Sequence, residues 1–78
     1  MQVEVQYFAV LRERRGEREE VLEIEMGLTV AELYQRVFPP SDGGALAVMF
    51  AVNQVYVQSD HVLEDGDEVA FIPPLGGG

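Results

Sequence analysis

The last residues of the chain, Pro73-Pro74-Leu75-Gly76-Gly77-Gly78, could carry chemistry without a reactive side chain. Glycine has no Cβ, so this segment can pass through a narrow channel and adopt any backbone angle inside it. Six residues extend by about 20 Å at most, the depth of a partner's active site. The unhindered carboxylate of Gly78 could be adenylated by another enzyme and converted by a sulfur donor to a thiocarboxylate, a nucleophile that is acquired instead of encoded.

The other residue types argue against a self-contained enzyme. The chain has no cysteine, which excludes a disulfide, a thiolate metal site and a thiol nucleophile. His61 is its single histidine, so a catalytic triad or a multi-histidine metal site is not expected. Asp65, Asp67 and Glu68 lack the spacing of a calcium loop and are explained by a turn. We expect no metal site and no bound cofactor.

Charge and hydropathy limit the partners and the location. A net charge of −9 repels phosphate backbones and anionic lipids, so no nucleic-acid or membrane partner is expected, whereas basic grooves would attract the chain. No segment approaches the roughly 20 apolar residues that span a bilayer, and the N-terminus does not resemble a signal peptide. These features predict a cytoplasmic protein. Lysine is absent, which argues against lysine-linked polymers of the chain.

The elements that must position the tail begin with two alternating segments. Residues 2–8 place Val3, Val5 and Tyr7 on one face, and residues 20–26 place Leu22, Ile24 and Met26 on one face. A period of two predicts half-buried strands, paired as a hairpin. The charged residues 9–16 between them predict a short helical turn, with Gly16 in a left-handed C-terminal position.

A helix is predicted after the second strand. Thr29 and Glu32 have the spacing of a capping box, and Leu28 and Leu33 have that of a hydrophobic staple. One apolar stripe at helical spacing is formed by Val30, Leu33, Tyr34 and Val37. The prolines at 39–40 end this helix, which is short enough that it must pack on the sheet.

The second half of the chain predicts short strands and turns. In order, we expect a flexible turn at 41–44, a strand at 48–52, a hairpin turn at Asn53-Gln54, a strand at 55–57, a tight turn at 64–67 and a last strand at 68–72, with Val69 and Phe71 on one face. A hairpin, a crossing helix and a returning strand form an α+β fold of the ubiquitin-like β-grasp type, with a mixed sheet. The first and last strands should be parallel, because the helix supplies the crossover. We expect a domain at 1–72 and a flexible tail at 73–78.

Several motifs together resemble the small subunit of molybdopterin synthase, the MoaD family of ubiquitin-like sulfur carriers. They are Tyr7-Phe8-Ala9 with Arg12-Glu13 and Gly16, then Ala51-Val52-Asn53, Asp65-Gly66-Asp67-Glu68-Val69, and Phe71-x-Pro73-Pro74-x-x-Gly77-Gly78. The likeness spans nearly the whole chain. The ending together with the early Phe-Ala-x-x-Arg-Glu is its most specific part.

The resemblance implies a function. A ubiquitin-activating-type adenylyltransferase would use ATP to activate Gly78, which follows Gly77, and the carboxylate would become a thiocarboxylate. The tail would enter the large subunit of the synthase, in a heterotetramer, and donate sulfur to a cyclic pyranopterin phosphate to form the dithiolene of molybdopterin. The chain would thus act in a sulfurtransferase complex without catalytic side chains of its own.

The resemblance also implies a partner-binding surface. Its members are Phe8, Arg12, Phe71, Pro73, Pro74, Leu75 and Gly76. Phe8, Phe71 and Tyr56 are candidates for an exposed aromatic face, with core packing as the alternative for each. The arginines between 12 and 18 are explained by a solvated face balanced by acids, although the resemblance places Arg12 near the partner.

Three other functions stay open. The third glycine, Gly76, departs from the family's usual ending, and a sulfur carrier of the thiamin pathway shares the tail chemistry. A ubiquitin-like protein modifier would be conjugated through Gly78. A plain β-grasp binding module would have an inert tail, since terminal glycines are ordinarily disordered.

Overall fold

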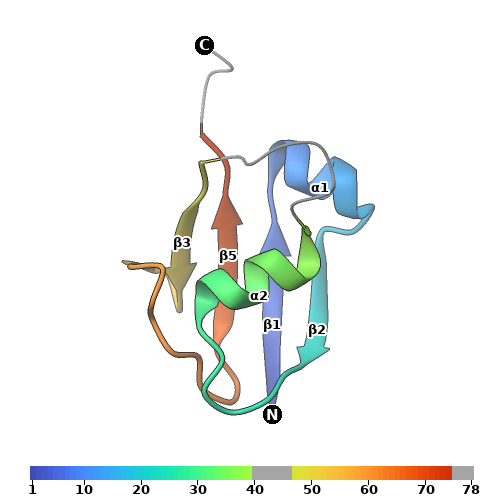
Figure 1. Cartoon of the computed structure of the whole chain (residues 1–78). Helices are drawn as coiled ribbons and strands as arrows, with labels where there is room; N and C mark the ends of the chain where they lie inside the picture. Colours follow the sequence, from blue (N-terminus) through green and yellow to red (C-terminus); the bar gives the residue numbers. More distant parts are fainter. Residues whose placement is uncertain (40–46, 75–78) are drawn as a thin grey trace.

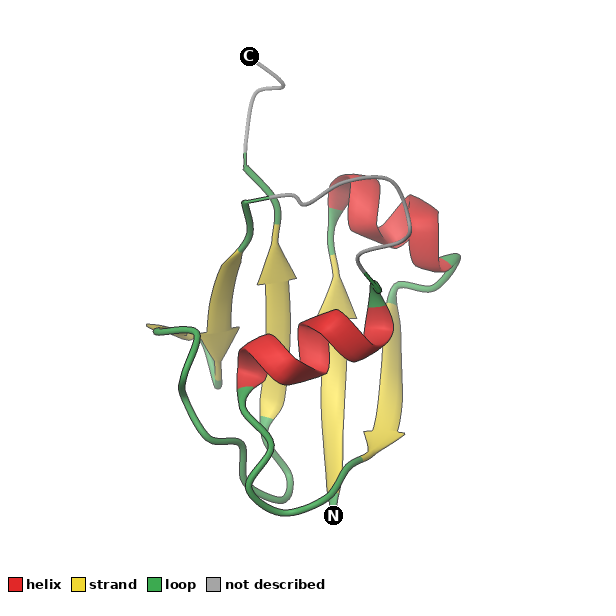
Figure 2. Cartoon of the chain, viewed as in Figure 1, coloured by secondary structure: helices red, strands yellow, loops and turns green. Residues whose placement is uncertain are grey.

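The computed structural model describes residues 1–39 and 47–74 of the chain. These residues form one five-stranded sheet, in the order β2-β1-β5-β3-β4, with helix α2 packed across one face (Figures 1 and 2). The elements are β1 (Gln2–Tyr7), α1 (Ala9–Arg15), β2 (Glu19–Glu23), α2 (Val30–Val37), β3 (Met49–Val52), β4 (Val55–Val57) and β5 (Glu68–Ile72).

The sheet is mixed, as the sequence predicts. β1 pairs with β2 in antiparallel and with β5 in parallel, and Tyr7 lies opposite Phe71 in the parallel pair. β3 pairs in antiparallel with both β4 and β5. Parallel neighbours require a crossover connection, and α2 lies within it. The expected α+β, β-grasp class is confirmed, and β5 lies at the centre of the sheet.

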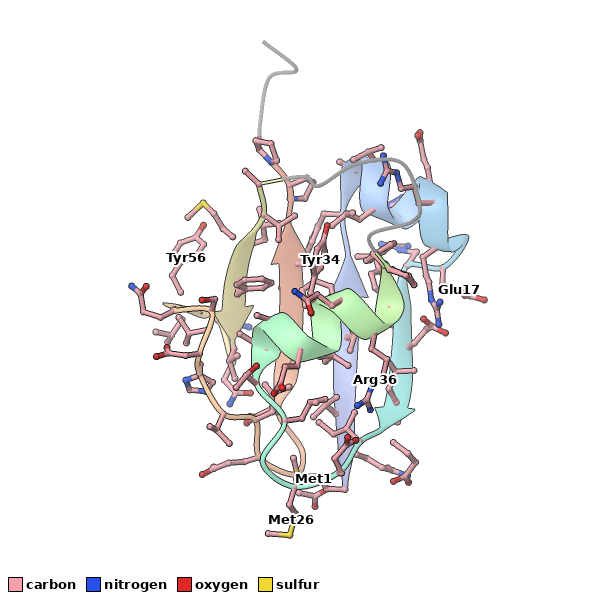
Figure 3. All side chains as sticks on the ribbon, viewed as in Figure 1. Met1, Glu17, Met26, Tyr34, Arg36 and Tyr56 are labelled. Atoms are coloured by element: carbon pink, nitrogen blue, oxygen red, sulfur yellow. The ribbon has the colours of Figure 1, made fainter. Side chains whose placement is uncertain are left out.

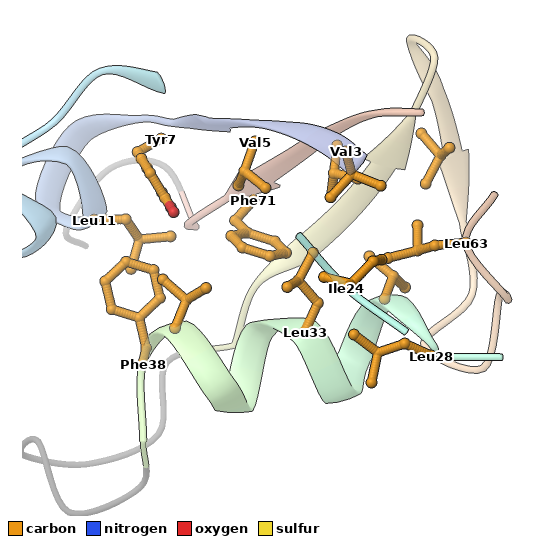
Figure 4. Close-up of a cluster of buried hydrophobic side chains, with 14 residues drawn as sticks. Val3, Val5, Tyr7, Leu11, Ile24, Leu28, Leu33, Phe38, Leu63 and Phe71 are labelled. Atoms are coloured by element: carbon orange, nitrogen blue, oxygen red, sulfur yellow. The ribbon is translucent and has the colours of Figure 1, made fainter. Parts of the chain in front are cut away.

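The core lies between α2 and the sheet (Figure 4). In β1 the alternation holds, because Val3, Val5 and Tyr7 are buried while Gln2 and Glu4 are exposed. Further buried side chains come from both layers: Leu11, Val30, Leu33, Val37, Phe38, Val69 and Phe71. The helix thus covers the face that the strand pattern predicts to be apolar. This packing holds the strands in place and so sets where β5 ends.

Helix α2 begins with the predicted capping box. The Glu32 amide donates to Thr29 Oγ1 at 3.2 Å, and the Thr29 amide donates to Glu32 Oε1 at 2.9 Å. Two otherwise unpaired amide groups at the start of the helix are thereby satisfied. Leu28 and Leu33 are both buried, consistent with the predicted staple. The helix ends with Phe38 as its C-cap, one residue before the first proline.

Two turns need backbone angles that few residues tolerate. Gly16 ends α1 with φ 79°, in the left-handed region predicted for it. Asn53 and Gln54 both have positive φ, 51° and 68°, and join β3 to β4 as a two-residue hairpin turn. The Asn53 side chain also donates to Asp67 Oδ1 at 3.0 Å and accepts from the Glu68 amide at 3.0 Å, so it ties this turn to the start of β5.

One prediction for β2 is wrong. The strand ends at Glu23, opposite Gln2, and the last backbone contact to β1 is that of the Ile24 amide, which donates to the Met1 carbonyl at 2.8 Å before the chain turns at Gly27. Ile24 is buried as expected, but Met26 is 86% exposed, ahead of a turn in which Gly27 has φ 88°. Figure 3 shows Met26 at the end of the molecule where β1 begins. The turn expected at 41–44 lies outside the described residues.

Candidate functional site

The tail leaves the domain from the central strand. β5 ends at Ile72, between β1 and β3, so its position is set by hydrogen bonds on both sides. Pro73 follows as a buried residue and Pro74 as an exposed one. The other predicted tail residues, Leu75, Gly76, Gly77 and Gly78, lie outside the described residues, so their roles stay predictions.

The sheet face opposite α2 has an apolar patch beside this exit. Phe8, Met49 and Tyr56 are 43%, 53% and 65% exposed. Met49 lies opposite Ile72 in the β3–β5 ladder, so these two side chains share a face. We call Phe8, Met49, Tyr56 and Ile72 the apolar patch. Figure 3 shows the Tyr56 side chain on the β3–β4 side of the molecule.

The apolar patch borders a shallow cleft of about 230 Å³. Ala51 and Ala70 lie opposite each other in the ladder and line the cleft, between the larger side chains of Phe8 and Tyr56. Small residues flanked by exposed aromatic groups make a concave apolar surface, which is suited to side chains from a partner. Sequence reasoning identified Phe8 and Tyr56 but missed Met49 and Ile72. The alternation of β5 could have placed Ile72 on the face opposite Phe71, whereas Met49 is placed by its pairing with Ile72.

The far end of the same face is acidic. Glu4 and Glu68 lie opposite each other where β1 pairs with β5, and Glu23 lies at the end of β2. The open face therefore changes from carboxylates near the start of β1 to apolar side chains near the end of β5. Glu68 also lines the cleft beside the apolar patch, so a partner that fills the cleft meets this carboxylate, whereas Glu4 and Glu23 do not line it.

Two predicted partner contacts are corrected by the structure. The Phe71 side chain is fully buried, because it alternates with Ile72 and therefore points toward α2. Its ring centroid lies 5.1 Å from that of Tyr34 and 5.9 Å from that of Phe50. Pro73 is also buried, so its ring is not presented on the surface. Phe71 and Pro73 support the exit from inside, whereas Phe8 and Pro74 are available to a partner.

The arginines around α1 divide into two kinds. Arg15 pairs with Glu20, which also accepts a hydrogen bond of 2.8 Å from the Tyr7 hydroxyl. The hydrogen bond from Arg15 lowers the pKa of Glu20, and burial raises the pKa of Tyr7. Arg15 thus has the balancing role expected from sequence. Arg12 is exposed and lines a second cleft with Phe8, and its place near a partner stays a prediction.

The remaining sites carry little chemistry. His61 is partly buried in the connection before β5. Within residues 1–39 and 47–74, no three histidine or acidic side chains lie close enough to hold a metal ion. In that same part of the chain, no helix is long and apolar enough to cross a membrane. The candidate functional site is therefore the tail exit together with the apolar patch.

Comparison with known proteins agrees with this architecture. The chain is 42% identical over 83 residues to the molybdopterin synthase sulfur carrier subunit of Chlamydomonas reinhardtii, with full coverage of both chains. It is 43% identical over 82 residues to that of Escherichia coli (strain K12), covering 97% of this chain and 99% of the relative.

A solved structure agrees as well. It is a Pyrococcus furiosus protein described as a molybdopterin converting factor, subunit 1. The TM-score is 0.77 at 32% identity, and the match covers 96% of this chain and 99% of the other. The sequence profile of the ThiS family matches residues 5–78, from the first strand to the last glycine. These findings confirm the resemblance that the sequence motifs carry: the chain belongs to the ThiS family, together with the sulfur carrier subunits of molybdopterin synthase.

Proposed function

We propose that this chain is the sulfur carrier of a molybdopterin synthase, with the sulfur held as a thiocarboxylate on Gly78. One observation carries the proposal: a glycine-ended segment leaves the central strand beside an uncovered apolar patch. The chain has no cysteine that could carry the sulfur on a side chain. The relatives described above, which match over nearly their whole length, support the assignment.

Activation would take place on a separate enzyme. A ubiquitin-activating-type adenylyltransferase would join the Gly78 carboxylate to the AMP part of ATP and release pyrophosphate. A sulfur donor would then displace AMP and leave the thiocarboxylate. The anionic sulfur is a far better nucleophile than the carboxylate, so the carrier gains its reactive group only when it is charged. This chemistry fits the predicted cytoplasmic location.

Sulfur donation would take place in the large subunit of the synthase. The apolar patch, together with Arg12 and Pro74, would bind the large subunit, as exposed aromatic and arginine side chains commonly do at interfaces. Leu75, Gly76 and Gly77 would cross the channel, and the sulfur would attack a cyclic pyranopterin phosphate to build the dithiolene. The large subunit would supply the catalytic side chains, in a complex of two large and two small subunits.

Intact-mass measurement tests the carrier chemistry directly. After incubation with the adenylyltransferase, ATP and a sulfur donor from the same organism, the mass should rise by the difference between sulfur and oxygen. The modification should map to Gly78. A chain that lacks Gly77 and Gly78 is the matched control, because its tail is about 7 Å shorter and its domain is complete. It should lose sulfur transfer by ~10²-fold or more, with unchanged thermal stability. An unmodified wild-type mass would refute the proposal.

The acceptor distinguishes the related alternatives. Purification together with a large pterin-binding subunit as a heterotetramer is expected for the synthase. Transfer of sulfur into a thiamin precursor would support the thiamin pathway instead. Attachment of the chain through Gly78 to lysines of other proteins would support a modifier.

A further inference from the structure

A second cleft lies next to the apolar patch and is basic. It has a volume of about 380 Å³ and lies where β1 meets the segments on either side of α1. Its lining residues are Gln6, Tyr7, Phe8, Arg12, Arg18 and Glu19. In a chain with fourteen acids and five bases, two arginines in one cleft make an unusual surface.

These two arginines differ from Arg15 and Arg36, which each pair with a glutamate. Within residues 1–39 and 47–74, neither Arg12 nor Arg18 forms an ion pair. Two guanidinium groups that line one cleft repel each other unless an anion lies between them. Glu19 also lines the cleft but forms an ion pair with neither arginine, so the two guanidinium groups can still accept a negative group from outside the chain.

The backbone fixes both arginines to the end of β1. The Tyr7 amide donates to the Arg18 carbonyl at 2.9 Å, although the two residues are distant in sequence. The Phe8 carbonyl accepts from the Leu11 amide at 3.0 Å and from the Arg12 amide at 3.4 Å. These bonds hold the backbone of both arginines close to the end of the strand that presents Phe8.

The basic cleft is continuous with the proposed interface. Gln6 and Phe8 line both this cleft and the apolar cleft on the open sheet face. A partner protein that buries Phe8 on the open sheet face is therefore also placed close to Arg12 and Arg18. The same ring forms a wall of each cleft.

We propose that this basic cleft, with Arg18 as its distinctive member, receives an aspartate or glutamate side chain of the large subunit. The inference rests on the proposed function. A protein carboxylate fits better than free phosphate for two reasons. Phe8 offers an apolar wall that only a larger body would bury, and Glu19 at the same cleft disfavours a doubly charged anion.

The cleft would also fix the orientation of the complex. A chain of net charge −9 repels an acidic protein surface almost everywhere else. An acidic residue of the partner is therefore favoured at this cleft, which shares Phe8 with the apolar patch, and like charges oppose many other arrangements. This gives Arg18 a role in recognition that the solvated-face interpretation of the arginine cluster lacks.

The test measures the dissociation constant of the carrier with the large subunit of the same organism, by calorimetry at low and high salt. Arg18→Ala should weaken binding by ~10-fold or more at low salt and flatten its salt dependence, and Arg12→Ala should act in the same direction. Arg18→Lys should keep part of the salt dependence, since it keeps the charge. Arg14→Ala is the matched control, because Arg14 is exposed on α1, the helix that also carries Arg12, and does not line the cleft. It should change binding by less than ~2-fold.

The outcomes separate this inference from the function on which it rests. If Phe8→Ala weakens binding while Arg18→Ala behaves like Arg14→Ala, the carboxylate site is refuted and the proposed function stands. If the wild-type chain does not bind the large subunit, both fail. Inorganic phosphate is the further probe. If it weakens binding more than chloride at equal ionic strength, and Arg18→Ala removes only this competition, the cleft is a phosphate site and the proposal is overturned.

Discussion

The two faces of this sheet are built from alternating residues of the same strands, yet one face is buried and the other is exposed. On one face, Tyr7 and Phe71 are almost completely buried beneath α2. On the other face, their immediate neighbours Phe8 and Ile72 belong to an apolar patch that no helix of the described chain covers. The chain buries the first face with its own helix, and the second face is left free for a partner to bury.

This contrast explains how a small chain can combine stability with recognition. A domain of this size buries only about 60–65% of its unfolded surface, so one helix can cover only one face. The face without a helix is open to association, and its apolar end lies beside the segment that carries the chemistry. Substitutions on the two faces should therefore change different measurements.

Replacement of Phe71 should have the largest effect. Its ring packs against four other aromatic rings, of Tyr7, Tyr34, Phe38 and Phe50. Phe71→Ala should lower the free energy of unfolding by ~3–5 kcal/mol, because it leaves a cavity in the core. Urea denaturation measures this loss. A loss below ~1 kcal/mol would show that the covered face is not the stabilising one.

Replacement of Phe8 should instead affect binding. Phe8→Ala should weaken association with the large subunit by ~5- to 30-fold, the range expected for a central aromatic contact of ~1–2 kcal/mol. The free energy of unfolding should change by less than ~1 kcal/mol, since the ring is 43% exposed. Calorimetric titration and urea denaturation of one preparation give both values. A variant that unfolds easily but binds normally would reverse the comparison.

The cap of α2 tests how firmly the covering helix is held. Thr29→Ala removes the hydroxyl that accepts from the Glu32 amide, and it should destabilise the domain by about 1 kcal/mol. Thr29→Ser keeps an acceptor and is the matched control. Thermal unfolding should show the difference, and binding to the large subunit at a temperature where both variants are folded should be the same. Equal stability of the two variants would mean that the cap is dispensable.

The smallest effect concerns the ion pair that joins α2 to the segment after β2. Arg36 donates to both carboxylate oxygens of Glu25 at 2.8 and 2.7 Å, and mainly through these bonds the pKa of Glu25 falls to about 2. A lowered pKa stabilises the fold above the ordinary value of 4.5, and this contribution is lost as the pH falls toward about 2. Wild type should therefore melt slightly above Glu25→Gln at neutral pH.

A pH series and a control variant test whether the ion pair causes this difference in melting temperature. The gap between wild type and Glu25→Gln should close as the pH falls toward about 2 and should shrink in high salt, because both groups are exposed. Glu17→Gln is the control, since Glu17 has no ion pair among residues 1–39 and 47–74. It should show no comparable gap. A gap for Glu25→Gln that persists at pH 2 would contradict the assigned cause.

Most of the fold could be predicted because its signals are local. The capping box at Thr29, the Asn53-Gln54 turn and the alternation of Val3, Val5 and Tyr7 depend on neighbours within a few residues. The two errors have different causes. Met26 continued the alternation of β2, but the ladder with β1 ends at Glu23 and the chain turns away at Gly27. Phe71 was assigned to the interface from its residue type, although its alternation with Ile72 directs it inward.

The site was predictable only in part, because some of its residues have local signals and others are placed by long-range pairing. Phe8 and the glycine ending were identified from residue type and motif, and the chemistry at Gly78 still rests on the sequence and its relatives. Met49 joins the apolar patch only through its place opposite Ile72, which is a long-range pairing. Arg18 is held at the basic cleft by the hydrogen bond from the Tyr7 amide to its carbonyl, which no local sequence pattern predicts.

The position of β5 has a mechanical consequence. A partner that pulls on the tail applies force along the axis of a strand that is hydrogen-bonded to β1 on one side and to β3 on the other. The load then acts on both ladders in shear, so many hydrogen bonds must yield together instead of opening one after another. We therefore expect the domain to resist extraction by a tight grip on its C-terminus, and repeated insertion and withdrawal should leave the sheet intact.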